Sequence, residues 1–172
     1  MSQEHADRAG MGTTLTAAYL SEDDRVLVAH VGDSRAYLFR DGELTRLTRD
    51  HSLVEELVRR GKLTEEQAET HPQRSVITRA LGPEPDVEVD VEGFDAKPGD
   101  LFLLCSDGLT SMVPEARVRA ALEIRGASLE QLGRGLIEAA NTAGGRDNIT
   151  VILFRLEDTG SGAGAEPAAE EE

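Results

Sequence analysis

The sequence predicts an α+β fold of layered sheets and helices, because the spacing of its apolar residues changes along the chain. Residues 12–48 carry strand signals, because β-branched Thr residues alternate with apolar ones in "GTTLTAAYL" and short apolar runs separated by turn residues follow. After residue 50 the apolar residues recur at helical spacing. Strands followed by helices favour an α+β fold over a parallel α/β sheet, and no GxxxxGK[ST] or GxGxxG motif is present.

Strands are expected first, at 12–20, 25–32, 34–40 and 43–48. The pair Asp41-Gly42 is a strong hairpin signal between the last two of them. Since these strands follow one another with short connections, we expect residues 12–48 to form one antiparallel meander.

Two short helices should follow the strands. In the first, over 51–63, Asp50 or Ser52 can cap the start and Gly61 can end it. The second, over 63–71, has the capping-box pair Thr64 and Gln67 at its start.

The second half should add three strands and two helices. An alternating strand is expected at 87–94, a central strand covered on both faces at 101–105, and a final buried strand at 149–156. Pro114 suits the first position of a helix, and a longer helix is expected over 128–144.

Composition bounds the function. The 172 residues suit one domain, expected over 11–157, between a disordered start (1–10) and an acidic disordered tail (158–172). The formal net charge of −15 argues against nucleic-acid binding and against attraction to an anionic membrane. The N-terminus is polar and no apolar run approaches the length of a membrane span, so we expect a cytoplasmic protein. Cys105 is the one cysteine and fits a small buried hydrophobe better than a catalytic thiol.

Three aspartates stand beside the ends of apolar strands. Asp33 follows "VLVAHVG", Asp107 follows "LFLLCS" and Asp147 precedes "NITVILF". Strand ends that meet at one rim of a sheet would gather these carboxylates, which repel one another unless a cation joins them. Oxygen ligands without Cys or paired His favour Mg²⁺ or Mn²⁺. Taken singly, each aspartate also fits an ordinary turn or cap.

Five stretches resemble, in this order, motifs of the bacterial metal-dependent type 2C (PPM-type) serine/threonine protein phosphatases. They are "GMGTTL", "AHVGDSRAYLFRDGELTRLTRDHSL", "HPQRSVITRALG", "LLCSDGLTSMV" and "GGRDNITVIL", and the resemblance covers about residues 10 to 156. It implies two antiparallel sheets stacked face to face, helices outside them, and two to three Mn²⁺ or Mg²⁺ ions at one end.

The resemblance also implies roles for individual residues. Asp107 and Asp147 resemble ligands of the second catalytic metal, and Asp33 resembles a ligand that shares a third metal with Asp107. The neighbouring positions that would support the metal loops are Gly32, Gly108 and Asn148. The two short helices and the stretch "HPQRSVITRALG" that follows them resemble the flap segment beside the active site. The residues expected to touch a phosphoprotein substrate are Arg74, Ser75, Thr78 and Arg79. Those four residues also fit a solvated loop with local capping.

The activity implied is hydrolysis of phosphoserine and phosphothreonine by a metal-activated water, without a phosphoenzyme intermediate or a side-chain nucleophile. The implied partners are phosphoproteins, including a Ser/Thr kinase or its substrates. Two other functions stay open: a non-catalytic pseudophosphatase fragment that acts as a binding module, and an unrelated acidic cation-binding domain.

The family pattern begins earlier than this chain. Upstream of "GMGTT" the family carries an Arg- and Asn-containing strand and a "DGMGG" loop whose aspartate bridges two metals, and residues 1–10 hold no counterpart. We therefore expect a domain that lacks its N-terminal part. A misassigned start, a decayed gene and an upstream piece supplied by another chain are the accounts that fit.

Overall fold

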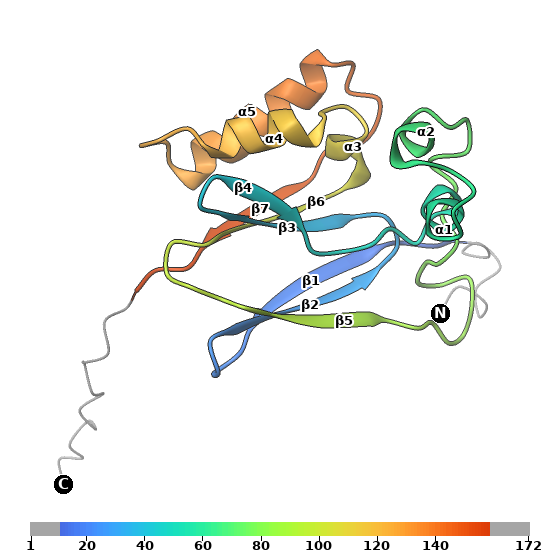
Figure 1. Ribbon diagram of the computed structural model, residues 1–172, viewed down its shortest axis with the longest axis horizontal. Coiled ribbons are helices and arrows are strands. Elements are labelled where there is room, and N and C mark those ends of the chain that lie inside the picture. Colours follow the sequence, from blue (N-terminus) through green and yellow to red (C-terminus); the bar gives the residue numbers. More distant parts are fainter. Residues whose placement is uncertain (1–10, 159–172) are drawn as a thin grey trace, which may run out of the picture.

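Two antiparallel sheets lie face to face in the computed structural model, which describes residues 11–158 of the chain (Figure 1). The three-stranded sheet has the order β1-β2-β5, formed by Leu15–Leu20, Arg25–Val31 and Asp90–Asp95. The four-stranded sheet has the order β4-β3-β6-β7, formed by Glu43–Arg46, Arg35–Arg40, Leu101–Cys105 and Val151–Arg155. The predicted α+β fold with two stacked sheets is confirmed.

The helices fall into two groups (Figure 1). One group stands beside one end of the two sheets and comprises α1 (Leu53–Arg59) and α2 (Glu65–Glu69). The other lies on the outer side of the four-stranded sheet and comprises α3 (Asp107–Thr110), α4 (Glu115–Leu122) and α5 (Leu129–Thr142). Ser52 rather than Asp50 caps α1, since the Glu55 N–H donates to Ser52 Oγ. The capping box of Thr64 and Gln67 is confirmed.

The predicted meander over residues 12–48 is wrong. β1 pairs with β2 and β3 pairs with β4, but the chain crosses from one sheet to the other between β2 and β3. The neighbour of β3 on its other side is β6, which follows about sixty residues later. The β1–β2 and β3–β4 hairpins form as expected, and the β3–β4 turn places both Asp41 and Gly42 at positive φ (53° and 81°).

Two apolar cores hold the layers together. The first lies between the sheets and contains Val26, Val28, Ala36, Leu38, Leu47, Phe102 and Leu104. The second joins the four-stranded sheet to its helices and includes Tyr37, Leu101, Leu103, Leu109, Val118, Leu132 and Leu136. Every residue of β6 is buried, as expected for a central strand covered on both faces.

Two local predictions need correction, and one short helix was not predicted. β7 is an edge strand that is only partly buried, because one of its sides has no neighbouring strand, and Ile152 is half exposed. Pro114 is the N-cap of α4 rather than its first helical residue. The short helix α3 is not predicted by the sequence, because the pair Asp107-Gly108 is typical of a turn. The predicted disordered start lies outside the described residues, as does the predicted tail apart from Asp158.

No helix within residues 11–158 combines the length and the apolar character needed to cross a membrane.

Candidate metal and substrate site

The three strand-end aspartates lie at the same end of the sheets. In the four-stranded sheet, Arg35 at the start of β3 is opposite Cys105 at the end of β6, which is opposite Val151 at the start of β7. Asp33 therefore precedes β3, Asp107 follows β6, and Asp147 precedes β7 on one side of the molecule. The sequence placed these residues beside strand ends, and the pairing of the strands brings those ends together.

The electrostatics of the three carboxylates show that they interact. Partial burial, followed by repulsion from Asp107 and Asp50, raises the pKa of Asp33 to about 6. Partial burial and repulsion from Asp147 raise the pKa of Asp107. Asp107 is thus coupled to an acid on either side, and a bound cation would offset the cost of ionising this group together with its neighbours.

Ser106 holds the two loops of this site against each other. Its hydroxyl donates to the Asn148 carbonyl (3.0 Å), and the Thr150 N–H donates to Ser106 Oγ (3.0 Å). Gly108 completes the contact, because a Cβ at this position would come within 2.3 Å of the Asn148 carbonyl oxygen. The close approach of these backbones requires glycine here and fixes Asp107 beside the loop that carries Asp147.

The donors present are suited to a hard cation but form only a partial ligand set. Carboxylate and carbonyl oxygens are what Mg²⁺ and Mn²⁺ bind, and mutual repulsion marks Asp33 and Asp107 as a place for positive charge. Within residues 11–158, however, no three His, Cys, Asp or Glu side chains lie close enough together to hold a metal ion. One Asp147 oxygen is also engaged, since it accepts the Asn148 N–H at 2.7 Å.

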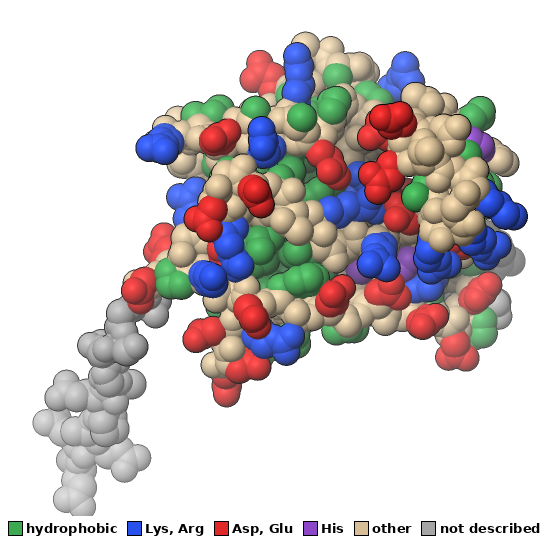
Figure 2. Space-filling model, viewed as in Figure 1, with side chains coloured by type: hydrophobic (Ala, Val, Ile, Leu, Met, Phe, Trp, Pro, Cys, Tyr) green, Lys and Arg blue, Asp and Glu red, His purple; other side chains and the backbone are tan. Residues whose placement is uncertain are grey.

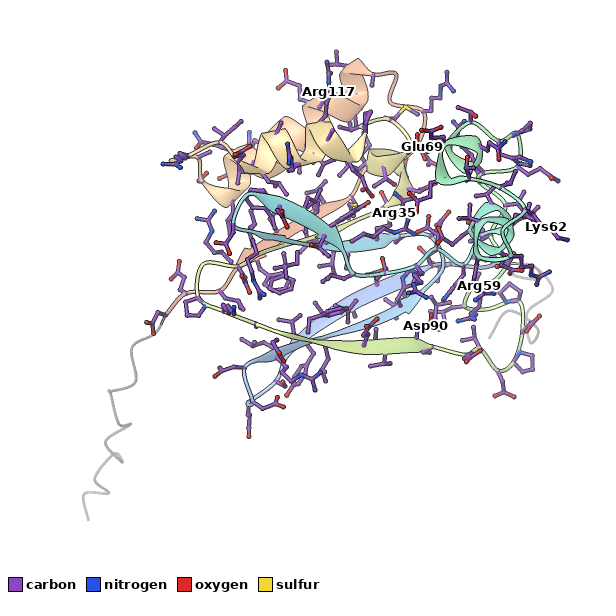
Figure 3. All side chains as sticks on the ribbon, in the orientation of Figure 1. Arg35, Arg59, Lys62, Glu69, Asp90 and Arg117 are labelled. Atoms are coloured by element: carbon purple, nitrogen blue, oxygen red, sulfur yellow. The ribbon has the colours of Figure 1, made fainter. Side chains whose placement is uncertain are left out.

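A half-buried arginine network, which the sequence does not predict, supports the site from the side. Arg35 binds Asp50 through two nitrogens (Nε–Oδ1 3.0 Å and NH2–Oδ2 2.8 Å) and also donates to the Tyr37 hydroxyl at 3.2 Å (Figure 3 labels Arg35). Arg46 donates to the same carboxylate at 2.7 Å. Two guanidinium groups therefore balance Asp50, whose charge would otherwise add fully to that of the strand-end aspartates.

The flap residues lie in a segment of turns. The exposed members are Arg74, Ser75 and Thr78, whereas the Arg79 side chain is 30% exposed and forms ion pairs with Asp90 (2.7 Å) and Glu88 (3.6 Å). The Thr78 N–H donates to the His51 carbonyl, and the His51 N–H donates to the Gly32 carbonyl. The segment is thereby connected to the turn that contains Asp33.

Exposed cations gather on the same side of the molecule. Figure 2 shows several Lys and Arg side chains at and below α1, and Figure 3 labels Arg59 at the end of α1 and Lys62 just after it, both of them exposed. Within the described part of the chain, neither of them forms an ion pair, and nor does Arg74. These cations are free to meet an anionic ligand.

Cys105 lies in the core between the four-stranded sheet and its helices. Its side chain is 4% exposed at the end of β6, and burial raises the pKa of the thiol to about 12. The prediction of a small buried hydrophobe is confirmed.

A cavity of about 810 Å³ lies away from these groups. It is lined by residues such as Phe39, Leu122 and Arg155, and in the sheet Phe39 and Arg155 both lie opposite Leu101. Leu101 is at the opposite end of β6 from Asp107. The cavity is therefore separate from the aspartate site.

Comparison with known proteins identifies the family. The family model for protein phosphatase 2C matches residues 2–149. A serine/threonine phosphatase stp of Listeria monocytogenes is 44% identical over 164 residues, which are 95% of this chain and 64% of that protein. The serine/threonine protein phosphatase PstP of Mycobacterium tuberculosis is 45% identical over 152 residues, 88% of this chain and 29% of that protein. The chain thus spans less than two thirds of the length of these relatives.

Solved structures of similar proteins support the same family. The crystal structure of the Mycobacterium tuberculosis phosphatase PstP/Ppp matches with a TM-score of 0.85 at 44% identity, over 90% of this chain and 64% of that one. A catalytic domain of PstP in complex with two manganese ions matches with a TM-score of 0.81 at 40% identity, over 91% and 64%. With the paired strand ends, the shared motifs and the match over most of its length, this chain belongs to the protein phosphatase 2C family.

Proposed function

We propose that residues 11–157 are the C-terminal portion of a phosphatase domain that hydrolyses phosphoserine and phosphothreonine on proteins. The single observation that carries this proposal is the group of strand-end carboxylates, in which Asp107 is coupled to Asp33 and to Asp147. Membership of the protein phosphatase 2C family supports it. Phosphoproteins, with a Ser/Thr kinase or its substrates among them, are the proposed partners, and a cytoplasmic location stays a prediction from the sequence.

In this proposal Asp33, Asp107 and Asp147 would hold Mn²⁺ or Mg²⁺. The similar catalytic domain of PstP was solved in complex with two manganese ions, which favours Mn²⁺ as the first ion to test. When bound, such an ion supplies Lewis-acid activation of water and neutralisation of phosphoryl charge. The chain itself orients the carboxylates, through the two hydrogen bonds of Ser106 on one side and the turn at Gly32 on the other. Gly32, Gly108 and Asn148 act through their backbones in this scheme.

Substrate binding is proposed for the side with exposed cations. The Arg74 guanidinium and the Ser75 and Thr78 hydroxyls are exposed in the segment that connects to the Asp33 turn. Charged donors bind phosphate oxygens strongly, and a phosphoprotein segment that lies here would place its phosphate toward the carboxylates and their cation. Arg79 is already paired with Asp90, so its contribution to substrate binding would be indirect.

The test is hydrolysis of a phosphothreonine peptide by the purified chain with and without Mn²⁺. We expect metal-dependent release of phosphate that falls about 100-fold or more in Asp107→Asn, because lost metal charge costs several kcal/mol in the transition state. Asp41→Asn is the matched control, since Asp41 lies in the β3–β4 turn at the far end of the sheet. Equal loss in both variants, or activity without metal, would count against the proposal.

A second function is favoured by one observation. Within residues 11–158 the acidic side chains do not form a closed metal site, so the described part of the chain also suits a pseudophosphatase that binds phosphoproteins without cleaving them. In that case the folded chain would release no phosphate with any metal. It would still bind the phosphothreonine peptide, with affinity that drops in Arg74→Ala and stays the same in Asp107→Asn.

A further inference from the structure

A buried histidine forms two hydrogen bonds to the turn that carries Asp33. The backbone N–H of His51 donates to the Gly32 carbonyl at 2.7 Å, and the backbone N–H of Gly32 donates to the ring atom Nδ1 of His51 at 3.1 Å. The His51 side chain is 8% exposed. Gly32 itself is buried at φ +112°, where a Cβ would come within 2.3 Å of the Thr14 side chain. One residue therefore holds both hydrogen-bonding groups of the glycine that precedes Asp33.

The hydrogen bonds of His51 define its proton position. Because Nδ1 accepts from a backbone N–H, the ring proton belongs on Nε2, which donates to Asp90 Oδ2 at 3.1 Å. The other Asp90 oxygen accepts from Arg79 Nη1 at 2.7 Å. Arg79 Nη1 also lies 3.0 Å from His51 Nε2. Because both atoms carry hydrogen, this short distance reflects two donors that bind the same carboxylate.

Charge at Asp90 is stabilised by this arrangement. Partial desolvation acts to raise the pKa of Asp90, but hydrogen bonds from His51 and Arg79 outweigh it and the pKa is lowered. Figure 3 labels Asp90 at the end of β5 that lies nearest α1. A guanidinium, a carboxylate and an imidazole thus form a continuous chain that ends on the Gly32 amide.

We propose that Arg79, Asp90 and His51 are positioning residues that couple the flap segment to the Asp33 turn. The segment is fixed at two further points, since Thr78 N–H donates to the His51 carbonyl and Leu53 N–H donates to the Val76 carbonyl. Residues that orient a ligand-bearing loop act on metal affinity without touching the metal. The consequence for metal and substrate rests on the proposed function, whereas the coupling itself does not.

The order of the contacts gives each residue a distinct part. His51 grips the turn, Asp90 fixes the ring orientation and proton position of His51, and Arg79 transmits the position of the flap segment to Asp90. His30 packs beside His51 with ring centroids 4.9 Å apart, but it bonds to Thr16 and to the Arg49 carbonyl and stands outside the chain of contacts.

The first test is residue-resolved amide hydrogen exchange and imidazole ¹⁵N NMR of the metal-free chain. We expect the Nε2–H tautomer at His51 and, in Asp90→Asn, exchange at Gly32 that is about tenfold faster, the size of one weakened hydrogen bond. Asp95→Asn is the matched control, because Asp95 ends the same strand with a side chain that is 90% exposed. Arg79→Lys keeps the charge and should give a smaller change at Gly32.

Several results would overturn the proposal. These are an Nδ1–H tautomer at His51, equal exchange at Gly32 in both aspartate variants, or acceleration that is uniform over all core amides and so reports only lost stability. If Asp90→Asn fails to fold, Arg79→Lys answers the same question.

The second test is titration with Mn²⁺ followed at the Asp33 and Asp107 amides by paramagnetic broadening. Affinity should fall about tenfold in Asp90→Asn and stay unchanged in Asp95→Asn. A faster-exchanging Gly32 with no metal binding in any form of the chain would support the coupling and contradict the proposed function. Metal binding that is equal in all variants would contradict the coupling alone.

Discussion

Within residues 11–158, the four-stranded sheet is covered on both faces, whereas the three-stranded sheet is covered on one. Helices α3, α4 and α5 close the outer side of the first with side chains such as Leu109, Leu132 and Leu136, each at most 3% exposed. On the outer side of the second, Leu15, Tyr19 and Val91 are 50%, 64% and 64% exposed. Figure 1 shows no described element below that sheet.

The two sheets therefore depend on different amounts of buried area. The four-stranded sheet takes part in both apolar cores, but the three-stranded sheet takes part only in the core between the sheets. Apolar burial is the main favourable term in folding, so partial opening should begin at β1, β2 and β5. Substitutions on the two sheets can test this contrast.

The greatest loss of stability is expected within a matched pair of leucines. Leu136→Ala in α5 should lower the free energy of unfolding by about 3 kcal/mol, because it leaves a cavity at a fully buried position. Leu15→Ala on the exposed outer face of the three-stranded sheet, called the open face below, should cost less than about 1 kcal/mol. Urea unfolding of both variants measures the pair, and equal losses would remove the contrast between the sheets.

An intermediate effect is expected where the sheets are tied together. Arg40 of β3 donates to both oxygens of Asp100, at 2.7 and 2.6 Å, and also to the Asp95 carbonyl of β5 at 2.8 Å. The Asp100 side chain is 3% exposed, and Lys97 N–H is a further donor to it. Asp100→Asn should therefore cost about 2 kcal/mol, because the buried acceptor of these hydrogen bonds loses its charge while Arg40 keeps partial access to water.

This effect should depend on pH. Burial opposes ionisation of Asp100, but the bonds from Arg40 and Lys97 prevail and its pKa in the folded chain lies below 3.8. A lowered folded-state pKa gives stability that is present above the unfolded pKa and is lost as pH falls through the folded one. The difference in the free energy of unfolding between the parent chain and Asp100→Asn should thus be largest at pH 7 and shrink below about pH 4. A gap that widens in acid would show that the sign is wrong.

The least change in stability is expected on the open face. Tyr19→Lys should change the free energy of unfolding by less than about 0.5 kcal/mol, since the tyrosine is 64% exposed. It should nevertheless reduce the binding of a hydrophobic dye, because exposed apolar patches bind such probes. Ile124→Lys, which is 60% exposed near α4, is the control and should leave most of the dye signal in place.

Much of the fold followed from local pattern. The Asp41-Gly42 turn, the capping box at Thr64 and the fully buried β6 are features of a few adjacent residues, and sequence spacing predicts such features well. The crossing between β2 and β3 was missed because Gly-Asp between two apolar runs has the same local signature whether the strands pair or separate. Strand partners are decided by packing over long sequence distances.

The residues of the candidate site also fall into those that the sequence predicts and those that it does not. Asp33, Asp107 and Asp147 could be singled out because each stands beside a strand end, and family motifs surround them. His51, Asp90 and Arg79 are brought together over 39 and 28 positions of separation, with no shared spacing or motif. Arg79 was expected to contact substrate, a role that no described contact tests, and its bond to Asp90 could not be read from the chain.

The buried thiol of Cys105 has a practical consequence. With 4% exposure and a pKa of about 12, it is almost entirely uncharged at neutral pH and sheltered from alkylating reagents and peroxide. A cysteine introduced at exposed Lys62, or at Tyr19 on the open face, would therefore be the one position that takes a spin label or dye. Paired probes at those two places would report the separation of the α1 side from the three-stranded sheet in solution, with the natural cysteine left in place.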